Sequence, residues 1–306
     1  MDRAIITGAT GMIGIALIEE CVKQGVSVVA ITRPQSVKKS LLPESDLISI
    51  VECELSEYDI LADLVPKGNG VFYHFAWGAT GIQRNVSVEY QCENIKYTLY
   101  ALKAAGLIGC SKFIGAGSQA EYGYISDGRI GAETTVNPNT PYGISKYAAG
   151  KLSMIKAAEI EIDCIWARIF SVYGKHDKPT TMISTAISKM LKDEETAFTK
   201  AEHYWDYLYS EDAGLALYLL GKAGKDQEVY CIGSGCSNPL KYYIHIIWDL
   251  IKPQHAPGIG QIPYMDQQVL HLHADIDSLI RDTGFYPRYS FEMGIKETIE
   301  FMKKNS

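Results

Sequence analysis

Short apolar runs alternate with longer amphipathic segments along the chain up to about Tyr173. The short runs predict buried strands, and the segments with apolar residues three and four positions apart predict helices. The expected strands are residues 4–7, 27–32, 47–51, 70–76, 112–116 and 164–169. The expected helices are residues 13–24, 57–65, 87–105 and 141–160. This alternation predicts an α/β fold of the Rossmann type, with a doubly wound parallel sheet and right-handed crossovers.

The alternation degrades after Tyr173, where Pro and Gly become more frequent. We therefore expect a larger domain over residues 1–174, joined again by roughly residues 207–235, with residues 229–232 returning as a strand to the main sheet. A smaller C-terminal lobe is expected from residues 175–206 and 236–306.

Composition and charge narrow the function classes. The chain has 306 residues, 47% hydrophobic and 21% charged, and a net charge of −7, which argues against a broad nucleic-acid footprint. No apolar run reaches the roughly 18 residues that a membrane span needs. The N-terminus leads straight into a strand pattern rather than a signal peptide. Seven cysteines without a C-x-x-C pair are expected to be reduced thiols of a cytoplasmic protein, mostly buried.

A glycine-rich turn follows the first predicted strand, with three glycines spaced G-x-x-G-x-x-G before the first predicted helix. Glycine permits positive φ and leaves no side chain between the backbone and a diphosphate. The helix that follows offers unpaired N–H groups and a positive dipole end. In a strand–helix–strand unit this pattern indicates dinucleotide binding, with a purely structural turn as the alternative. The residues expected at the cofactor are Gly8, Thr10, Gly11, Met12, Ile13 and Gly14.

The end of the second predicted strand bears on the choice of cofactor. NAD sites usually place an acidic residue there for the ribose 2′-OH. Here the chain reads Thr32-Arg33-Pro34, without a carboxylate. Arg33, helped by Lys38, can accept a 2′-phosphate as a charge-assisted fork. NADP(H) is therefore favoured over NAD(H), and a solvated loop arginine is the alternative.

Tyr142 and Lys146 place a phenol and an ammonium four residues apart, on one face of the predicted helix 141–160. A nearby cation stabilises the phenolate and lowers the tyrosine pKa, so that the phenol can give or take the proton of an alcohol or ketone. The same spacing also occurs on ordinary solvated helix faces. Its weight therefore depends on the glycine-rich turn and on Ser118 upstream.

Together these features resemble the extended short-chain dehydrogenase/reductases, and more narrowly the family of nucleotide-sugar epimerases, dehydratases and reductases. The resemblance runs nearly end to end. It is carried by YHFAW at 73–77, similar to H-L-A-A, and by GSQAEYG at 117–123, similar to S-S-x-x-x-Y-G. Further matches are PYGISK at 141–146 to P-Y-x-x-S-K, RIFSVYG at 168–174 to R-x-F-N-V-Y-G and WDYLYSED at 205–212 to R-D-F-I-H-V-x-D.

The resemblance implies a role for each matched residue. Tyr142 would exchange the proton of the reacting sugar hydroxyl, and Ser118 would orient the same oxygen. Lys146 would lower the tyrosine pKa and hold the nicotinamide ribose, while the nicotinamide carries the hydride. The larger domain would thus bind the cofactor and the smaller lobe the substrate. Further cofactor positions implied by the resemblance are Glu54, Leu55, Phe75, Ala76, Trp77, Asn94 and Tyr142. Asn94 would also support the geometry of the site.

Departures from the family pattern bear on the reaction. Gln119 and Ala120 follow Ser118, where dehydratases of the family carry an Asp-Glu pair, so that elimination of water is disfavoured. Ketoreduction and epimerisation remain, because both use Ser118, Tyr142 and Lys146. The residues at 117–123 also resemble those of bacterial 4-keto-6-deoxy-sugar reductases such as CDP-abequose synthase.

We therefore expect NADPH-dependent reduction of a 4-keto, deoxy nucleotide sugar. A nucleotide-sugar 4-epimerase with tightly bound NAD is the alternative. A catalytically silent dinucleotide sensor is a third hypothesis, although such proteins usually lose the tyrosine or the lysine.

Gln119, Glu121, Ser171 and Trp205 are expected to contact the nucleotide-diphosphate sugar. Trp205 stands where many relatives direct an arginine at the diphosphate, and its ring can instead stack on a base or a sugar. The remaining candidates for holding the diphosphate are Lys189, Lys192, Arg281 and Arg288.

Two further expectations concern partners. His271, His273 and Asp275 have the residue types of a metal site, but no further ligand is evident in the sequence and the family implies no metal role, so no metal is expected. The helices predicted at 87–105 and 141–160 form a four-helix homodimer interface in relatives, and a homodimer is expected by that analogy.

Overall fold

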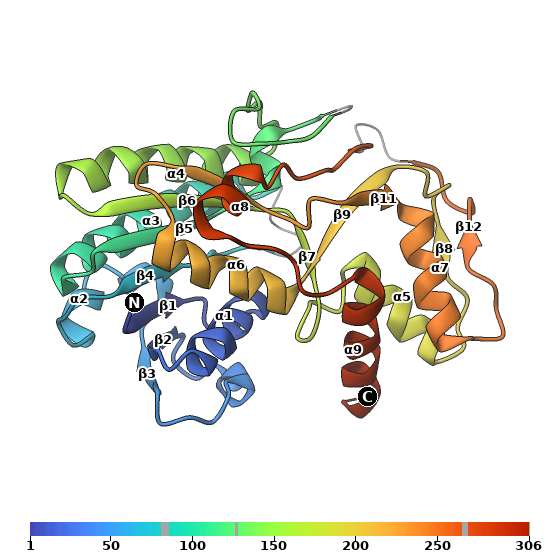
Figure 1. Ribbon diagram of the computed structural model, residues 1–306, viewed down its shortest axis with the longest axis horizontal. Coiled ribbons are helices and arrows are strands. Elements are labelled where there is room, and N and C mark those ends of the chain that lie inside the picture. Colours follow the sequence, from blue (N-terminus) through green and yellow to red (C-terminus); the bar gives the residue numbers. More distant parts are fainter. Residues whose placement is uncertain (81–85, 126–127, 265–268, 306) are drawn as a thin grey trace.

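A computed structural model describes residues 1–80, 86–125, 128–264 and 269–305. Its centre is a seven-stranded sheet in the order β10-β6-β5-β4-β1-β2-β3, in which each neighbouring pair is parallel (Figure 1). The predicted doubly wound α/β fold is therefore confirmed. The strands are β1 (Arg3–Thr7), β2 (Ser27–Thr32), β3 (Ile48–Glu52), β4 (Val71–His74), β5 (Lys112–Ser118), β6 (Asp163–Ile169) and β10 (Val229–Ile232).

Helices cover both faces of this sheet (Figure 1). On one face α3 packs on α4, and on the other α1 packs on α6. Successive side chains of β1 point to opposite faces of the sheet. Ala4 and Ile6 therefore pack in the core beneath α1 and α6, and Ile5 packs in the core beneath α3 and α4. The bounds of these helices are α1 (Met12–Lys23), α3 (Val88–Ile108), α4 (Pro141–Glu159) and α6 (Ser210–Ala223).

The smaller lobe has its own sheets and core (Figure 1). Tyr173, Ile187, Ile244 and Ile295 are buried together in that core. The strands of the lobe are β7 (Ser171–Tyr173), β8 (Ala197–Phe198), β9 (Tyr204–Tyr209), β11 (Ser237–Pro239) and β12 (Gly258–Ile259). Its helices are α5 (Met182–Leu191), α7 (Leu240–Ile251) and α9 (Phe291–Lys304).

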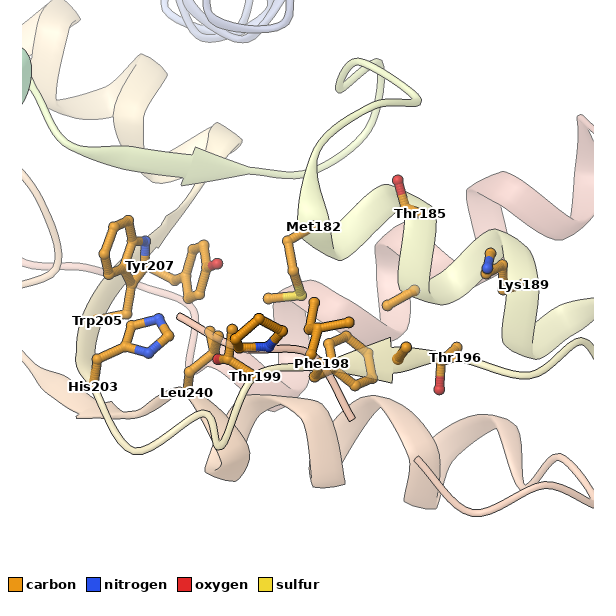
Figure 2. A pocket seen from close by; sticks show the side chains of 14 residues that line it. Met182, Thr185, Lys189, Thr196, Phe198, Thr199, His203, Trp205, Tyr207 and Leu240 are labelled. Carbon is orange, nitrogen blue, oxygen red and sulfur yellow. The ribbon is translucent and has the colours of Figure 1, made fainter. Parts of the chain in front are cut away.

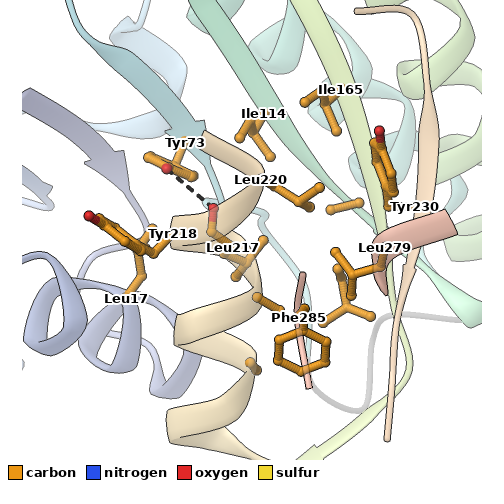
Figure 3. Packing of buried hydrophobic residues seen from close by; sticks show 14 of the residues in the cluster. Leu17, Tyr73, Ile114, Ile165, Leu217, Tyr218, Leu220, Tyr230, Leu279 and Phe285 are labelled. Atoms are coloured by element: carbon orange, nitrogen blue, oxygen red, sulfur yellow. Dashed lines mark hydrogen bonds between the residues drawn. The ribbon is translucent and has the colours of Figure 1, made fainter. Parts of the chain in front are cut away.

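The predicted boundary assigns all of residues 236–306 to the smaller lobe. In the structure, part of this segment lies on the larger domain instead. Helix α8 (Asp277–Thr283) packs on α6 and β10 of the larger domain. Leu279 and Phe285 join Leu217 and Ile165 in the core beneath α6 (Figure 3). The physical reason is that this segment covers apolar surface of α6 and β10 that would otherwise be exposed. The return of residues 229–232 to the sheet, beside β6, is as predicted.

The predicted helix at 57–65 is largely absent. A 3₁₀ turn, η2 (Leu55–Glu57), is followed by a single helical turn, α2 (Leu61–Leu64). Pro66 helps to end it, because the residue before a proline disfavours helical geometry, and Val65 is extended. Among the helices of the described residues, none combines the length and apolarity needed to cross a membrane.

Candidate active site

The glycine-rich turn joins β1 to α1 with very little space around it. Gly8 has a φ of +67°, and a Cβ at this position would lie 2.8 Å from the backbone of Phe75 and Ala76. A Cβ on Gly14 would overlap the carbonyl oxygen of Gly8. Gly11 caps α1 without any side-chain hydrogen bond. The first N–H groups of the helix, at Met12 and Ile13, are thus left to an anion such as a diphosphate.

The carboxyl end of β2 provides a second candidate contact for a ligand bound at the glycine-rich turn. Arg33 is exposed just beyond the strand and forms no ion pair with any described residue. Thr32 is only 4% exposed, and its hydroxyl has no hydrogen-bond partner among the described residues. A buried hydroxyl without a partner is unfavourable unless a ligand or water completes it. Glu54 and Leu55 follow the neighbouring strand β3, next to this edge.

The loop after β4 is fixed by α3. Asn94 is buried, accepts a hydrogen bond from the Gly78 N–H at 2.7 Å and donates to the Gly78 carbonyl at 3.2 Å. Gln91 accepts a hydrogen bond from Trp77 Nε1 at 2.8 Å. Asn94 thus holds the loop that starts at Phe75 and Ala76, beside Gly8.

His74 is a structural residue of the same region. Its Nδ1 lies 2.9 Å from Thr7 Oγ1 and its Nε2 lies 3.3 Å from Thr98 Oγ1. Burial, and to a lesser extent the nearby Lys146, lowers the pKa of His74 to about 3. The imidazole is therefore neutral at physiological pH and ties β1, β4 and α3 together.

Lys146 occupies a buried position between α4 and β5. Its Nζ donates a hydrogen bond to the Ala116 carbonyl at 2.6 Å and lies 3.7 Å from the centroid of the Trp77 ring. Burial lowers the pKa of Lys146 to about 7, and the negative charge of Glu121 partly opposes this shift. Burial thus disfavours the charged form of Lys146, whereas an anionic neighbour such as a phenolate would favour it.

Tyr142 lies in the first turn of α4, close to Lys146. Thr140 caps the helix by accepting a hydrogen bond from the Gly143 N–H at 3.1 Å, and Pro141 occupies the first turn, which together fix where the helix begins. The Lys146 Nζ lies 5.9 Å from the centroid of the Tyr142 ring. The Tyr142 and Trp77 rings meet edge to face at 6.2 Å.

Ser118 ends β5 and caps the short 3₁₀ helix η4 (Gln119–Tyr122). Its Oγ accepts a hydrogen bond from the Ala120 N–H at 3.2 Å, which leaves the hydroxyl proton to be donated to a ligand oxygen. Gly143 packs so closely on the Ala120 carbonyl that a Cβ would overlap it, and this contact sets the start of α4 beside the turn. The Gln119 Oε1 is buried without a partner among the described residues.

Glu121 differs from the expected substrate contact. Its side chain is fully buried, and Oε1 accepts hydrogen bonds from the Ser118 N–H at 2.8 Å and from Trp166 Nε1 at 2.9 Å. Its Oε2 accepts from Arg168 Nε at 2.8 Å. The carboxylate thus lies behind Ser118 in the protein interior, because the Arg168 guanidinium holds it there.

Ser171 and Trp205, both expected at the substrate, lie together. Trp205 Nε1 donates to Ser171 Oγ at 2.8 Å. The indole borders a pocket of about 440 Å³ in the smaller lobe, shown in Figure 2. His203 also lines it, is 8% exposed and has an Nδ1 without a partner among the described residues. The other labelled lining residues are Met182, Thr185, Lys189, Thr196, Phe198, Thr199, Tyr207 and Leu240.

The structure separates the four candidate diphosphate partners. Lys189 lines the pocket, at the opposite end from Trp205 (Figure 2). Arg281 pairs with Asp282 at 2.9 Å, and Arg288 lies 3.3 Å from Asp212, so both are engaged elsewhere. Lys192 follows the end of α5 and is not among the residues that line the pocket.

The imidazoles of His271 and His273 form hydrogen bonds with backbone carbonyl oxygens. His271 Nδ1 lies 3.1 Å from the Gly128 carbonyl oxygen, and His273 Nε2 lies 3.1 Å from that of Gly235. These contacts give both rings a structural role.

Sequence reasoning missed Trp166, the role of Arg168, and His203. A signal for the first was present, because Gly115 and Gly117 alternate on β5, and both make room for the Trp166 ring on β6. No comparable signal marked His203, since its partnerless nitrogen is visible only once the lobe is folded.

Residues 4–233 match the model of the NAD dependent epimerase/dehydratase family. CDP-abequose synthase from Salmonella muenchen is 26% identical over 97% of this chain and 97% of its own length. dTDP-glucose 4,6-dehydratase from Streptomyces niveus is 24% identical over 99% of this chain and 93% of its own. The structure of UDP-N-acetylglucosamine 4-epimerase from Methanobrevibacter ruminantium M1 shares the fold, with a TM-score of 0.89, 20% identity and coverage of 100% of this chain and 99% of that one.

The buried ammonium of Lys146 gives a prediction for stability. The pKa of this lysine falls from 10.5 to about 7 on folding, so between these values the unfolded chain binds more protons and the free energy of unfolding rises with pH. The quantity to measure is the free energy of unfolding of the wild type minus that of Lys146→Met, from urea unfolding without ligands. We expect this difference to rise between pH 7.5 and 8.5 by up to about 1.4 kcal/mol per pH unit. Lys103 is an exposed residue of α3, and the difference in free energy of unfolding between the wild type and Lys103→Met should not change with pH. A flat difference for Lys146→Met would show that the folded protein keeps this proton.

Proposed function

This chain belongs to the NAD dependent epimerase/dehydratase family and is an NAD(P)-dependent enzyme of the extended short-chain dehydrogenase/reductase type, and from that premise we propose that it reduces a 4-keto, deoxy nucleotide sugar with NADPH. The observation that carries the proposal is the turn after Ser118. Gln119 has no titrating group, Ala120 has no proton to move, and the Glu121 carboxylate is buried against Arg168. Tyr142 then remains as the proton-transfer residue of the site, which suits reduction at one carbon better than elimination across two.

In this proposal the residues of the chain act on the carbonyl oxygen of the substrate. A nicotinamide bound in this domain would supply the hydride that the carbonyl carbon receives. Tyr142 donates its phenolic proton to the oxygen as the C–O double bond becomes an alcohol, and solvent then restores the proton. Ser118 donates a hydrogen bond to the same oxygen and orients it. Lys146, close to Tyr142, stabilises the phenolate that forms.

The pocket of the smaller lobe fits the nucleoside of such a substrate. Apolar and aromatic side chains surround a few polar groups, as is typical of small-molecule sites. Trp205 offers a ring face for stacking on a base or sugar. The partnerless Nδ1 of buried His203 offers one hydrogen bond to a polar edge of the ligand.

Epimerisation with retained NAD is the second candidate, because Ser118, Tyr142 and Lys146 serve it equally well. The likeness to a solved 4-epimerase, over the full chain, keeps it open at the level of the fold. The two reactions differ in whether the dinucleotide leaves after each turnover. The nucleotide released by denaturing the purified protein distinguishes them, since an epimerase would release stoichiometric NAD⁺.

The carboxyl end of β2 supports NADP(H) as the cofactor. It offers the exposed guanidinium of Arg33 and the partnerless hydroxyl of Thr32, and no carboxylate follows the strand directly. An acidic residue here would repel a 2′-phosphate, whereas Arg33 can pair with it.

The exposed faces of α3 and α4 support a homodimer. Ile144, Leu152 and Ile155 share one face of α4 and are 51%, 43% and 61% exposed. Val88 and Leu107 on α3 are also more than half exposed. Because the two helices pack side by side, a second copy of this chain could cover exposed apolar residues of both.

Tyr142→Phe tests the proposed reaction. We expect NADPH oxidation with a 4-keto-6-deoxy nucleotide sugar to slow by about 10²- to 10⁴-fold, because the proton donor is lost, while NADPH affinity falls far less than the rate. Tyr147→Phe, one residue beyond Lys146, is the matched control and should retain full turnover. Absorbance at 340 nm follows the reaction. Unchanged turnover of Tyr142→Phe would refute the proton-transfer assignment.

Arg33→Ala tests the cofactor. We expect it to weaken NADPH binding by about 10- to 100-fold, the usual contribution of a charge-assisted hydrogen bond, and to leave NADH binding nearly unchanged. Calorimetric titration of the purified protein measures both affinities, with Lys103→Ala as a control. Equal effects on both cofactors, or tighter NADH than NADPH binding by the wild type, would contradict the NADP(H) assignment.

Ile155→Glu tests the dimer. A charge in the apolar face should turn a dimeric wild type into a monomer, as measured by size-exclusion chromatography with light scattering. Val37→Glu, at a residue 87% exposed and remote from α3 and α4, should leave the dimer intact. A monomeric wild type at micromolar concentration would exclude this part of the proposal.

A further inference from the structure

The carboxylate behind Ser118 belongs to a built network. Three donors converge on Glu121: the Ser118 N–H and Trp166 Nε1 on one oxygen, and Arg168 Nε on the other. Glu121 and Arg168 are 0% and 4% exposed. Only one of the three donors belongs to the candidate active site, and it is the backbone of the serine itself.

Neighbouring positions are adapted to this network. A Cβ on Gly117 would lie 2.6 Å from Glu121 Oε1 and would also overlap Trp166 Nε1. Gly150 of α4 leaves room for the same indole, because a Cβ there would approach the ring to 2.6 Å. The strand that carries Ser118 thus lacks a side chain at the position where the carboxylate and the indole meet.

The arginine is held at its other end as well. Arg168 Nη1 donates to the Tyr122 hydroxyl at 3.0 Å, and that hydroxyl donates to the Gly131 carbonyl at 2.7 Å. The guanidinium is therefore fixed on both sides. Glu121 in turn is fixed by three hydrogen bonds, so that the Ser118 N–H bonds to an oxygen that cannot move away.

Such a network is poorly explained by stability alone. Buried ion pairs are often no more stabilising than apolar residues of similar size, because desolvation offsets the attraction. The bond to the Ser118 N–H, by contrast, restricts the residue whose hydroxyl must point at a reacting oxygen. Small misplacements of such a group lower the rate strongly.

We propose that Glu121 is a positioning residue, which acts through the backbone of Ser118 to fix the direction of the Ser118 hydroxyl, with Arg168 and Trp166 holding its carboxylate in place. The inference rests on the proposed function, in which Ser118 orients the substrate oxygen. It concerns a residue that touches neither the cofactor nor the substrate.

Two paired variants separate positioning from mere structure. Glu121→Val with Arg168→Met replaces the ion pair by apolar side chains and removes the acceptor for the Ser118 N–H. Glu121→Gln with Arg168→Gln removes both charges but keeps a side-chain oxygen that can accept from Ser118, while the two amides can pair with each other. Replacing both partners avoids an unpaired buried charge, so both proteins should fold.

We expect the Val/Met pair to lower kcat for the 4-keto sugar by about 10- to 100-fold, with KM and NADPH affinity nearly unchanged. The Gln/Gln pair should recover most of this loss. Thermal unfolding reports stability separately. Wild-type kcat in the Val/Met pair, or an equal loss of kcat in both pairs, would overturn the inference.

Amide hydrogen exchange tests the network without any turnover. The segment 117–123 should exchange faster in the Val/Met pair than in the wild type or the Gln/Gln pair. If the wild type reduces no 4-keto sugar, the proposed reaction fails while this exchange pattern still tests the role of Glu121. If reduction is found but exchange and kcat are the same in all three proteins, only the inference about Glu121 fails.

Discussion

The hydrogen bond from Lys146 to the Ala116 carbonyl is the contact around which the site is organised. It joins the first turns of α4 to β5, two residues before Ser118. Because Tyr142 lies one helical turn before Lys146, fixing the lysine also fixes the phenol relative to the end of the strand. Trp77, held by Gln91 of α3, packs against both side chains. Strand, loop and helix thus meet at one buried ammonium.

The electrostatics of this region follow from burial. Lys146 is in a dry environment that lowers its pKa toward neutrality, and His74 nearby is neutral for the same reason. The buried carboxylate of Glu121, close by, is paired with Arg168 and cannot act as an acid or base toward a ligand. The site therefore combines a transferable proton on Tyr142 with a Glu121–Arg168 pair that is held in place, which fits the transfer of one proton.

Local patterns allowed much of this to be predicted from sequence. The alternation of strands and helices, the glycine-rich turn and the Tyr142/Lys146 spacing each depend on residues close in the chain. The sequence did not show that Glu121 faces inward, because that depends on Arg168, a partner 47 positions away. The packing of α8 on α6, and the partnerless nitrogen of His203, are likewise products of tertiary contacts. Nor did the apolar positions at 57–65 reveal how short α2 is.

The most direct test of the central claim is the fate of the hydride. NADPH carrying deuterium at both C4 positions is incubated with the enzyme and a 4-keto-6-deoxy nucleotide sugar, and the sugar product is analysed by mass spectrometry and NMR. We expect one deuterium at C4 of the product and one NADP⁺ formed per product molecule. Recovery of the unreduced 4-keto sugar, with no net consumption of NADPH, would contradict it.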